Sequence, residues 1–121
     1  MLFDNGDNRN WGEAPSYSRA VEYRIDDNAR TIQQVWTFGK EQANHLYSRV
    51  VSNVDYYPIE RRLIFSAGSV NDDGVPVGRV VELDYDSKAV IFEATVIPEV
   101  APFGVTFHRT ERLRLYTDPI P

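Results

Sequence analysis

The chain reads Arg19-Ala20-Val21-Glu22-Tyr23-Arg24-Ile25-Asp26 and, sixty residues later, Arg79-Val80-Val81-Glu82-Leu83-Asp84-Tyr85-Asp86. In both stretches apolar and polar side chains alternate, which is the pattern of an antiparallel strand with one buried face. A pattern that returns at a fixed spacing of this size indicates stacked structural units of one kind. The repeat therefore predicts two sheet units built on the same plan.

The segments around the two stretches repeat as well. Each stretch follows a short apolar run that ends in glycine, which is Leu2–Gly6 in the first unit and Leu63–Gly68 in the second. Each stretch is followed, after a polar turn, by a second β-rich run, which is Thr31–Trp36 in the first unit and Ala89–Ala94 in the second. The repeat therefore extends over several consecutive strands.

One more candidate strand ends each unit, Val51–Tyr57 in the first and Val105–Leu113 in the second. Each unit then holds four antiparallel strands, which is typical of the blades of a β-propeller. We expect unit one to span about residues 1–57 and unit two about residues 58–113, with a tail over residues 114–121.

The segment Lys40–Tyr47 has a helical pattern, because good helix formers without a β-branched residue follow Gly39. We therefore expect an all-β fold of about two four-stranded antiparallel propeller blades with one short helix. A complete propeller usually has about four blades or more. Met1 lies inside the first predicted strand and not before it, so we expect the propeller to continue before Met1.

Composition excludes several classes of function. The formal net charge is −5 and the pI is about 4.9, so the chain lacks the basic excess that nucleic-acid binding requires. The chain contains no cysteine, which excludes disulfides and thiolate metal sites. No segment approaches the ~18 apolar residues of a membrane helix, and the N-terminus has no export signal. We predict neither a nucleic-acid partner nor a membrane partner.

Two acidic turns, Asp4–Asn8 and Asn71–Gly74, superficially suggest calcium sites. Neither has glycine at the sixth position and glutamate at the twelfth, as a calcium-binding loop requires. Asn-Gly and Asp-Gly pairs are favoured in tight turns because glycine readily adopts positive φ. We therefore predict turns at both places, no bound metal and no cofactor.

Several blocks occur in a characteristic order, and they are Leu2–Arg9, Tyr17–Asp26, Gln33–Glu41, Tyr47–Ser48, Ser52–Tyr56 and Gly78–Asp84. In order and spacing these blocks resemble the C-terminal part of bacterial arylsulfate sulfotransferases. The resemblance covers nearly the whole chain, so we expect residues 1–121 to form a single C-terminal propeller fragment. It implies a six-bladed propeller enzyme that is usually exported to the periplasm.

The resemblance also implies an activity. Members of the family transfer a sulfuryl group from a phenyl sulfate ester to a phenol through a transiently sulfated histidine, without a nucleotide sulfate donor. Such covalent catalysis divides one displacement into two, and cationic groups and N–H donors stabilise charge on the sulfate oxygens. In the family this histidine precedes the block that begins here at Leu2. We therefore place no catalytic residue in this chain and expect it to be inactive alone.

The repeat places His108 on a strand equivalent to the one that begins near Ser52-Asn53-Val54. In a propeller the first strand of a blade faces the central channel, and the resemblance places tyrosine followed by arginine here, of which Arg109 keeps the arginine. Five residues are candidates for contact with substrate, and they are Tyr47, Ser52, Asn53, His108 and Arg109. A structural hydrogen bond from His108 to a neighbouring blade is the alternative, and His45 is expected on the helix surface.

Two functions of different kinds follow. The first is the C-terminal portion of an arylsulfotransferase, which the missing N-terminal blades would complete and which would act on a phenolic sulfate donor and a phenol acceptor. The second is a non-catalytic β-sheet module that binds a partner or associates with itself. Two blades alone leave apolar faces and strand edges uncovered, which favours association in either case.

Overall fold

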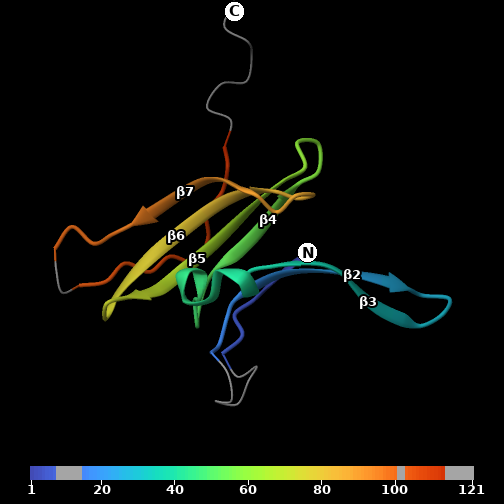
Figure 1. The fold of residues 1–121 in the computed structure, drawn as a ribbon, viewed down its shortest axis with the longest axis horizontal. Helices are drawn as coiled ribbons and strands as arrows, with labels where there is room; N and C mark the ends of the chain where they lie inside the picture. Colours follow the sequence, from blue (N-terminus) through green and yellow to red (C-terminus); the bar gives the residue numbers. More distant parts are fainter. Residues whose placement is uncertain (8–14, 101–102, 114–121) are drawn as a thin grey trace, which may run out of the picture.

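Two antiparallel sheets make up the computed structural model, which describes residues 1–7, 15–100 and 103–113 (Figure 1). The first sheet has the strand order β1-β2-β3 and the second has the order β4-β5-β6-β7. The elements are β1 (Leu2–Asp4), β2 (Arg19–Asp26), β3 (Thr31–Phe38), the helix η1 (Lys40–Leu46), β4 (Asn53–Tyr57), β5 (Arg62–Asp72), β6 (Val75–Asp84) and β7 (Val90–Val96). The prediction of an all-β antiparallel fold with one short helix is confirmed.

The repeated sequence forms equivalent strands, β2 in the first sheet and β6 in the second. Both strands carry a register irregularity directly after the glutamate of the repeat, between Glu22 and Tyr23 in β2 and between Glu82 and Leu83 in β6. Such an irregularity re-aims the side chains that follow it. Because it recurs at the same place, β1-β2-β3 corresponds strand for strand to β5-β6-β7.

The position of β4 differs from the sequence prediction. The sequence places Val51–Tyr57 at the end of the first unit, but β4 pairs with β5 and is the first strand of the second sheet. Val51 and Ser52, with φ of 57° and 91°, turn the chain just before β4 begins. A repeat shows which segments are alike but not which strand each segment pairs with. The pairing depends on which strand edge is free, and for Val51–Tyr57 that free edge is the edge of β5.

The second predicted closing strand, Val105–Leu113, is not a strand in the structure. The amide of Val105 donates to the carbonyl of Pro76 at 2.8 Å, and the amide of Phe107 donates to the carbonyl of Gly68 at 3.0 Å. Gly68 lies in β5 and Pro76 in β6, and the ring of Phe107 lies where a side chain at Gly78 in β6 would project from the sheet. The segment therefore lies over the face of the second sheet. Residues 103–113 are called the C-terminal segment below.

The predicted helix is present but has a different type. The segment Lys40–Leu46 forms a 3₁₀ helix that is interrupted at Ala43, whose φ is 43°. A helix of this length has too few hydrogen bonds to be stable alone, so its packing decides its form. Leu46 at its end is buried in the core, which holds the last turn against β5.

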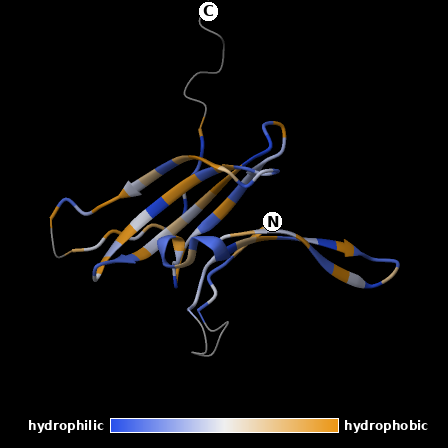
Figure 2. Ribbon diagram, in the orientation of Figure 1, coloured by the Kyte–Doolittle hydropathy of each residue, from blue (hydrophilic) through white to orange (hydrophobic). Residues whose placement is uncertain are grey.

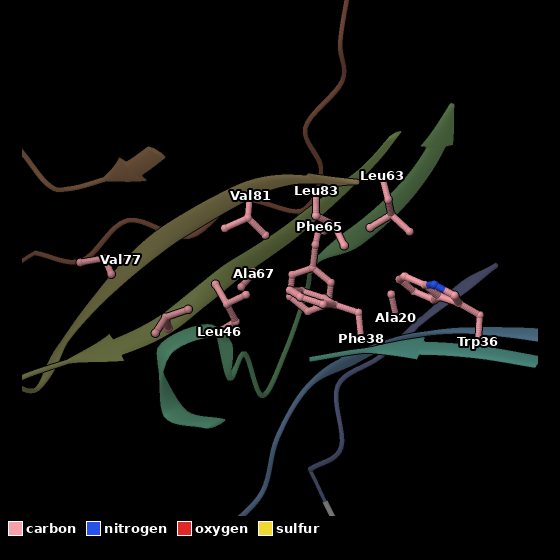
Figure 3. Close-up of a cluster of buried hydrophobic side chains, with 11 residues drawn as sticks. Ala20, Trp36, Phe38, Leu46, Leu63, Phe65, Ala67, Val77, Val81 and Leu83 are labelled. Atoms are coloured by element: carbon pink, nitrogen blue, oxygen red, sulfur yellow. The ribbon is translucent and has the colours of Figure 1, made fainter. Parts of the chain in front are cut away.

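The core lies between the two sheets (Figure 3). Phe38 of β3 meets Phe65 of β5 edge to face, with 5.7 Å between ring centroids, and Phe65 is 0% exposed. Phe3 of β1 contacts the same ring at 4.7 Å. The other buried members of this cluster are Ala20, Trp36, Leu46, Leu63, Ala67, Val70, Val77, Val81 and Leu83. Aromatic side chains from the first sheet therefore cover the inner face of the second.

In the described part of the chain, the opposite face of the first sheet leaves several apolar side chains exposed, although Val21 on the same face is buried. It carries Leu2, Val21, Tyr23, Ile25 and Ile32, which together with Met1 line a shallow hollow of about 410 Å³. Ile25 and Ile32 are 65% and 69% exposed, and both lie on the β2–β3 hairpin that extends beyond the second sheet (Figure 1, Figure 2). These five residues are called the open face below. A face of this kind usually marks an interaction surface.

Gly78 of β6 makes room for the C-terminal segment. A Cβ atom at this position would lie 2.0 Å from Cε1 of Phe107, so we expect Gly78→Ala to displace the segment. The two sheets should stay folded because the core lies on the other face of β6. Trypsin should then cleave after Arg109 and Arg112 faster than in the unmodified chain. Cleavage at an unchanged rate would contradict this contact, and Thr95→Ala, on the exposed strand β7, is the control.

Candidate functional site

The five predicted channel residues lie in three parts of the structure. Ser52 and Asn53 lie at the start of β4, His108 and Arg109 lie in the C-terminal segment, and Tyr47 directly follows η1. Their contacts show what each side chain does in the described part of the chain.

Ser52 belongs to a hydrogen-bond network between the two sheets. Its hydroxyl donates to Ser48 Oγ and accepts the amide N–H of Gly68, both at 2.9 Å. The buried hydroxyl of Ser18 donates to the Ser48 carbonyl at 3.1 Å and accepts the Ser48 amide at 2.9 Å. Asn5 Nδ2 donates to the same carbonyl at 2.7 Å. The network satisfies polar groups where the chain passes from one sheet to the other, so the Ser52 hydroxyl has a structural role here.

Asn53 holds the C-terminal segment in place. Its Oδ1 accepts the amide N–H of Thr110 at 3.1 Å, and its Nδ2 donates to the Thr110 carbonyl at 3.3 Å and to Asp55 Oδ2 at 2.8 Å. The Thr110 hydroxyl is also hydrogen-bonded to the hydroxyl of Ser66 in β5. A side-chain amide that binds both the N–H and the C=O of one residue imitates a strand neighbour. The structure thus brings Asn53 together with the segment that contains His108 and Arg109.

Arg109 lines a cavity of about 280 Å³ between β4 and the C-terminal segment, together with Asp55, Tyr56, Tyr57, Glu111 and Arg112. Arg109 Nη2 forms an ion pair with Glu111 Oε1 at 2.8 Å. The guanidinium of Arg112 lies 5.7 Å from the centre of the Tyr57 ring and 3.6 Å from Glu82 Oε1. Two carboxylates, Asp55 and Glu111, offset the charges of the two arginines in this cavity, so an anion that binds Arg109 must displace Glu111.

The two histidines lie apart from this cavity lining. His45 in η1 has its Nε2 2.7 Å from Glu93 Oε1 in β7, and its carbonyl accepts a hydrogen bond from Arg79 at 2.8 Å. His45 therefore ties the helix to the second sheet. His108 is exposed in a bend of the C-terminal segment. Among residues 1–7, 15–100 and 103–113, neither imidazole is surrounded by the several preorganised donors that sulfuryl transfer needs.

Tyr47 occupies a third environment. It is half-buried and lines a separate cavity of about 290 Å³ with Asn44 and Asn71. The role of Tyr47 in substrate contact stays a prediction. In the part of the chain that the structure describes, no group of three or more histidine, aspartate or glutamate side chains is arranged to hold a metal ion. No helix among these residues is long and apolar enough to span a membrane.

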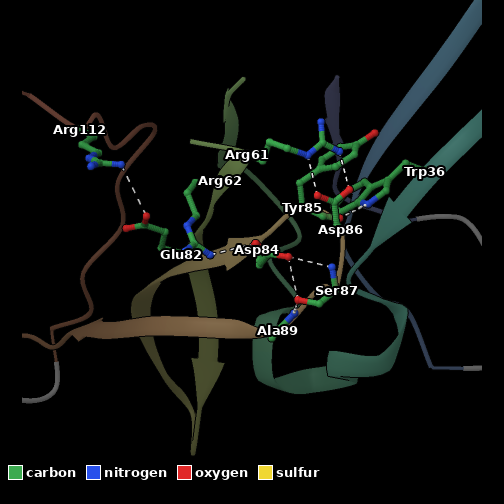
Figure 4. Close-up of polar contacts among 10 residues, drawn as sticks. All are labelled: Trp36, Arg61, Arg62, Glu82, Asp84, Tyr85, Asp86, Ser87, Ala89 and Arg112. Atoms are coloured by element: carbon green, nitrogen blue, oxygen red, sulfur yellow. Dashed lines mark hydrogen bonds and ion pairs between the residues drawn. The ribbon is translucent and has the colours of Figure 1, made fainter. Parts of the chain in front are cut away.

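A polar and aromatic cluster joins the outer parts of the two sheets (Figure 4). The Trp36 indole stacks on Tyr85 with 5.0 Å between ring centroids, and its Nε1 donates to the Tyr85 carbonyl at 2.8 Å. Arg61 covers the other part of Tyr85, with its Cζ 4.9 Å from the ring centre, and binds both Asp86 oxygens at 2.5 and 2.6 Å. Sequence reasoning did not single out Tyr85 as a contact residue, although its place in the repeat assigns it to the inner face of the sheet.

The charges in this cluster shift several pKa values. The Tyr85 hydroxyl donates to Glu22 Oε2 at 2.7 Å, and this hydrogen bond together with burial raises the pKa of Tyr85 to about 12. The hydrogen bond from Arg61 lowers the pKa of Asp86, and hydrogen bonds from Ser87 lower the pKa of Asp84. The bond from Tyr85 to Glu22 joins the two sheets, whereas the bonds of Asp84 and Asp86 lie within the second sheet and its turns.

The raised pKa predicts how the stability depends on pH. The hydrogen bond to Glu22 needs the neutral phenol, so its contribution is complete below the unfolded pKa of 10 and is lost as the pH rises through about 12. We expect Tyr85→Phe to lower the free energy of unfolding by about 1–2 kcal/mol at neutral pH. This difference should shrink between pH 10 and 12 in urea unfolding, whereas the exposed control Tyr23→Phe should show no such trend. A difference that stays constant up to pH 12 would refute the assignment.

Comparison with known proteins adds a second line of observation. The family model described as Arylsulfotransferase (ASST) matches residues 1–101. The chain is 40% identical over 106 residues to arylsulfate sulfotransferase AssT of Escherichia coli O6:H1 (strain CFT073). It is 38% identical over 106 residues to arylsulfate sulfotransferase AssT of Lelliottia amnigena. Each alignment covers 81% of this chain and 18% of the relative, so the chain spans less than a fifth of the length of these proteins.

Proposed function

Because the chain belongs to the arylsulfotransferase family, we propose that it contributes two sheets to an enzyme that transfers a sulfuryl group from an aryl sulfate ester to a phenol. The observation that carries this proposal is the match of the family model to residues 1–101. This match covers both sheets and both copies of the repeat.

The proposed reaction has two balanced displacements. A histidine nitrogen attacks the sulfur, the bond between sulfur and the aryl oxygen breaks, and a phenolate leaves with that electron pair. The oxygen of a second phenol then attacks the sulfur and restores the histidine, while its proton passes to a base. His45 is bonded to Glu93 at 2.7 Å and His108 is exposed. We therefore assign the nucleophile to a part of the enzyme outside this chain.

In the proposed enzyme, this chain forms part of the protein surface around the reacting group. Of the five candidates, Ser52 and Asn53 are engaged in hydrogen bonds within the chain. His108 and Arg109 are exposed, and Arg109 could exchange its ion pair with Glu111 for a sulfate oxygen. Arg109 is thus our preferred substrate contact. We extend to the working enzyme the periplasmic location that the resemblance implies.

Self-association is the second candidate function, and the open face favours it. Ile25 and Ile32 are exposed on a hairpin whose apolar face has no cover within the described residues. A chain that leaves such a face in water gains free energy when another protein surface covers it.

Complementation tests the proposed activity. We expect no phenol release from an aryl sulfate by the isolated chain, nor by a relative from which the matching C-terminal part has been deleted. The two together should restore transfer to a second phenol. In the restored enzyme Arg109→Ala should lower kcat/KM by about tenfold or more, and the exposed Arg24→Ala in β2 should not. Turnover by the isolated chain that disappears in His108→Ala would overturn the assignment of the nucleophile.

A further inference from the structure

The cavity between β4 and the C-terminal segment is built on one face of β4. Side chains alternate between the two faces of a strand, so Asn53, Asp55 and Tyr57 project to the same side of β4. Tyr56 projects to the other side, where its ring packs against Tyr85 with 4.9 Å between ring centroids. Of the two tyrosines in the cavity lining, Tyr57 is therefore the one whose ring can contact a bound molecule.

Hydrogen bonds hold the opposite wall of the cavity on both sides of Glu111. Before it, the side chain of Asn53 binds the N–H and the C=O of Thr110 at 3.1 and 3.3 Å. After it, the amide of Arg112 donates to the Tyr57 hydroxyl at 3.3 Å. The backbone at Glu111 is therefore held in place, whereas its side chain is 49% exposed and can change its partner.

Two ionic groups of the cavity are tied to other parts of the fold. Asp55 Oδ2 accepts a hydrogen bond from Asn53 Nδ2 at 2.8 Å. The Arg112 guanidinium lies 5.7 Å from the centre of the Tyr57 ring and 3.6 Å from Glu82 Oε1 in β6. Asp55 and Arg112 therefore help to hold the cavity walls together.

Arg109 and Glu111 form a more exchangeable contact. Their ion pair of 2.8 Å joins two side chains that are 62% and 49% exposed. Ion pairs between exposed groups contribute little to stability, because water solvates both charges well when they separate. A guanidinium is planar and can donate to two oxygens of one anion. Arg109 is therefore the cation of this cavity that can replace its carboxylate partner by another oxygen anion.

The cavity has the size of a small aromatic ligand. Its volume is about 280 Å³, which is close to the lower end of the range of about 300–1,000 Å³ for small-molecule sites. Its lining contains an exchangeable cation in Arg109 and an aromatic ring in Tyr57. A ligand that matches both is a single ring with an anionic oxygen group, because aromatic rings pack on one another and a guanidinium binds oxyanions.

We propose that this cavity binds the aryl sulfate ester, with the sulfate oxygens on Arg109 and the aryl ring against Tyr57, and that Glu111 competes with the ester for Arg109. The proposal rests on the proposed function, to which it adds Tyr57 and Glu111 as residues that determine the affinity for the donor. Without the ester, the Glu111 carboxylate occupies the guanidinium. When the ester binds, the Glu111 side chain turns to water, and Arg109 has an anionic partner in both states.

Competition by Glu111 makes the site selective. Glu111 lies two positions from Arg109 in the chain, so its effective concentration at the guanidinium is high and a free anion must displace it. An inorganic anion gains no ring contact that offsets this displacement, whereas an aryl sulfate gains the contact with Tyr57. A phenol that has lost its sulfuryl group has no sulfate oxygen on Arg109, so Glu111 returns to the guanidinium and the phenol dissociates.

Binding of phenyl sulfate to the chain itself tests the role of Glu111. The ester is added at constant ionic strength, and the dissociation constant is taken from the NMR shifts of the Thr110 and Arg112 amides. We expect Glu111→Gln to lower this constant by about two- to fivefold, because the competing carboxylate is gone. Arg109→Ala should abolish the shifts. Asp27→Asn is the matched control, since it removes the same charge from the exposed turn of the β2–β3 hairpin.

Three results of this titration would overturn the proposal. The first is the absence of shifts at Thr110 and Arg112 in the unmodified chain. The second is a dissociation constant that Glu111→Gln leaves unchanged. The third is a gain in affinity in Asp27→Asn that equals the gain in Glu111→Gln, because the effect would then come from the net charge and not from the cavity.

Inorganic sulfate tests the role of Tyr57. We expect phenyl sulfate to bind about two- to tenfold more tightly than inorganic sulfate, because only the ester contacts the tyrosine ring. Tyr57→Leu should remove this difference, and Tyr57→Phe should keep it because the ring stays. If Tyr57→Phe loses as much affinity as Tyr57→Leu, the hydroxyl that accepts the Arg112 amide is the important group, and the ring contact is refuted.

Kinetics separate this proposal from the proposed function. In the complemented enzyme, Glu111→Gln should lower the KM for the donor ester and leave the KM for the acceptor phenol unchanged. Turnover with an unchanged donor KM would contradict the competition by Glu111. If complementation gives no turnover while the chain binds phenyl sulfate as described, the proposed activity fails and the binding site stands.

Discussion

The packing of two β3 aromatics against the second sheet is the interaction on which the rest of the structure depends. Phe38 meets Phe65 at 5.7 Å, and Trp36 stacks on Tyr85 at 5.0 Å. This contact covers the inner face of each sheet, which would otherwise be exposed to water. The contact also fixes where β4 begins, because the chain must cross from the first sheet to the second at Ser48–Ser52.

This crossing explains why the candidate site residues have structural roles in the chain. The sequence predicts Ser52 and Asn53 as channel residues, because the first strand of a propeller blade faces the channel and polar side chains there suit a substrate. The same position is where two sheets and the C-terminal segment converge, so buried backbone groups need partners. Ser52 and Asn53 supply them. His108 and Arg109 are exposed, so contact with a ligand stays a prediction for these two residues.

Much of the fold could be predicted from particular residues. The alternation around Val21 and Val81 predicts equivalent strands, and the structure adds the same irregularity after Glu22 and Glu82. The pairing of β4 and the unpaired course of residues 105–113 could not be predicted, since both depend on which strand edges are free. The hydrogen bond from Tyr85 to Glu22 could not be predicted either, because the two residues are 63 positions apart and come together only when the sheets pack.

The family, the all-β class and the presence of two units on one plan follow from sequence patterns alone, because alternation and repeated blocks are local properties of the chain. Tertiary structure decided that the units hold three and four strands, that one apolar face is buried and its counterpart is open, and that the segment after β7 lies across a sheet. The physical reason is that the backbone groups of a strand edge and the apolar side chains of a sheet face need a partner, and only packing brings that partner next to them. A repeat says that two surfaces are alike, and only packing shows which of them is covered.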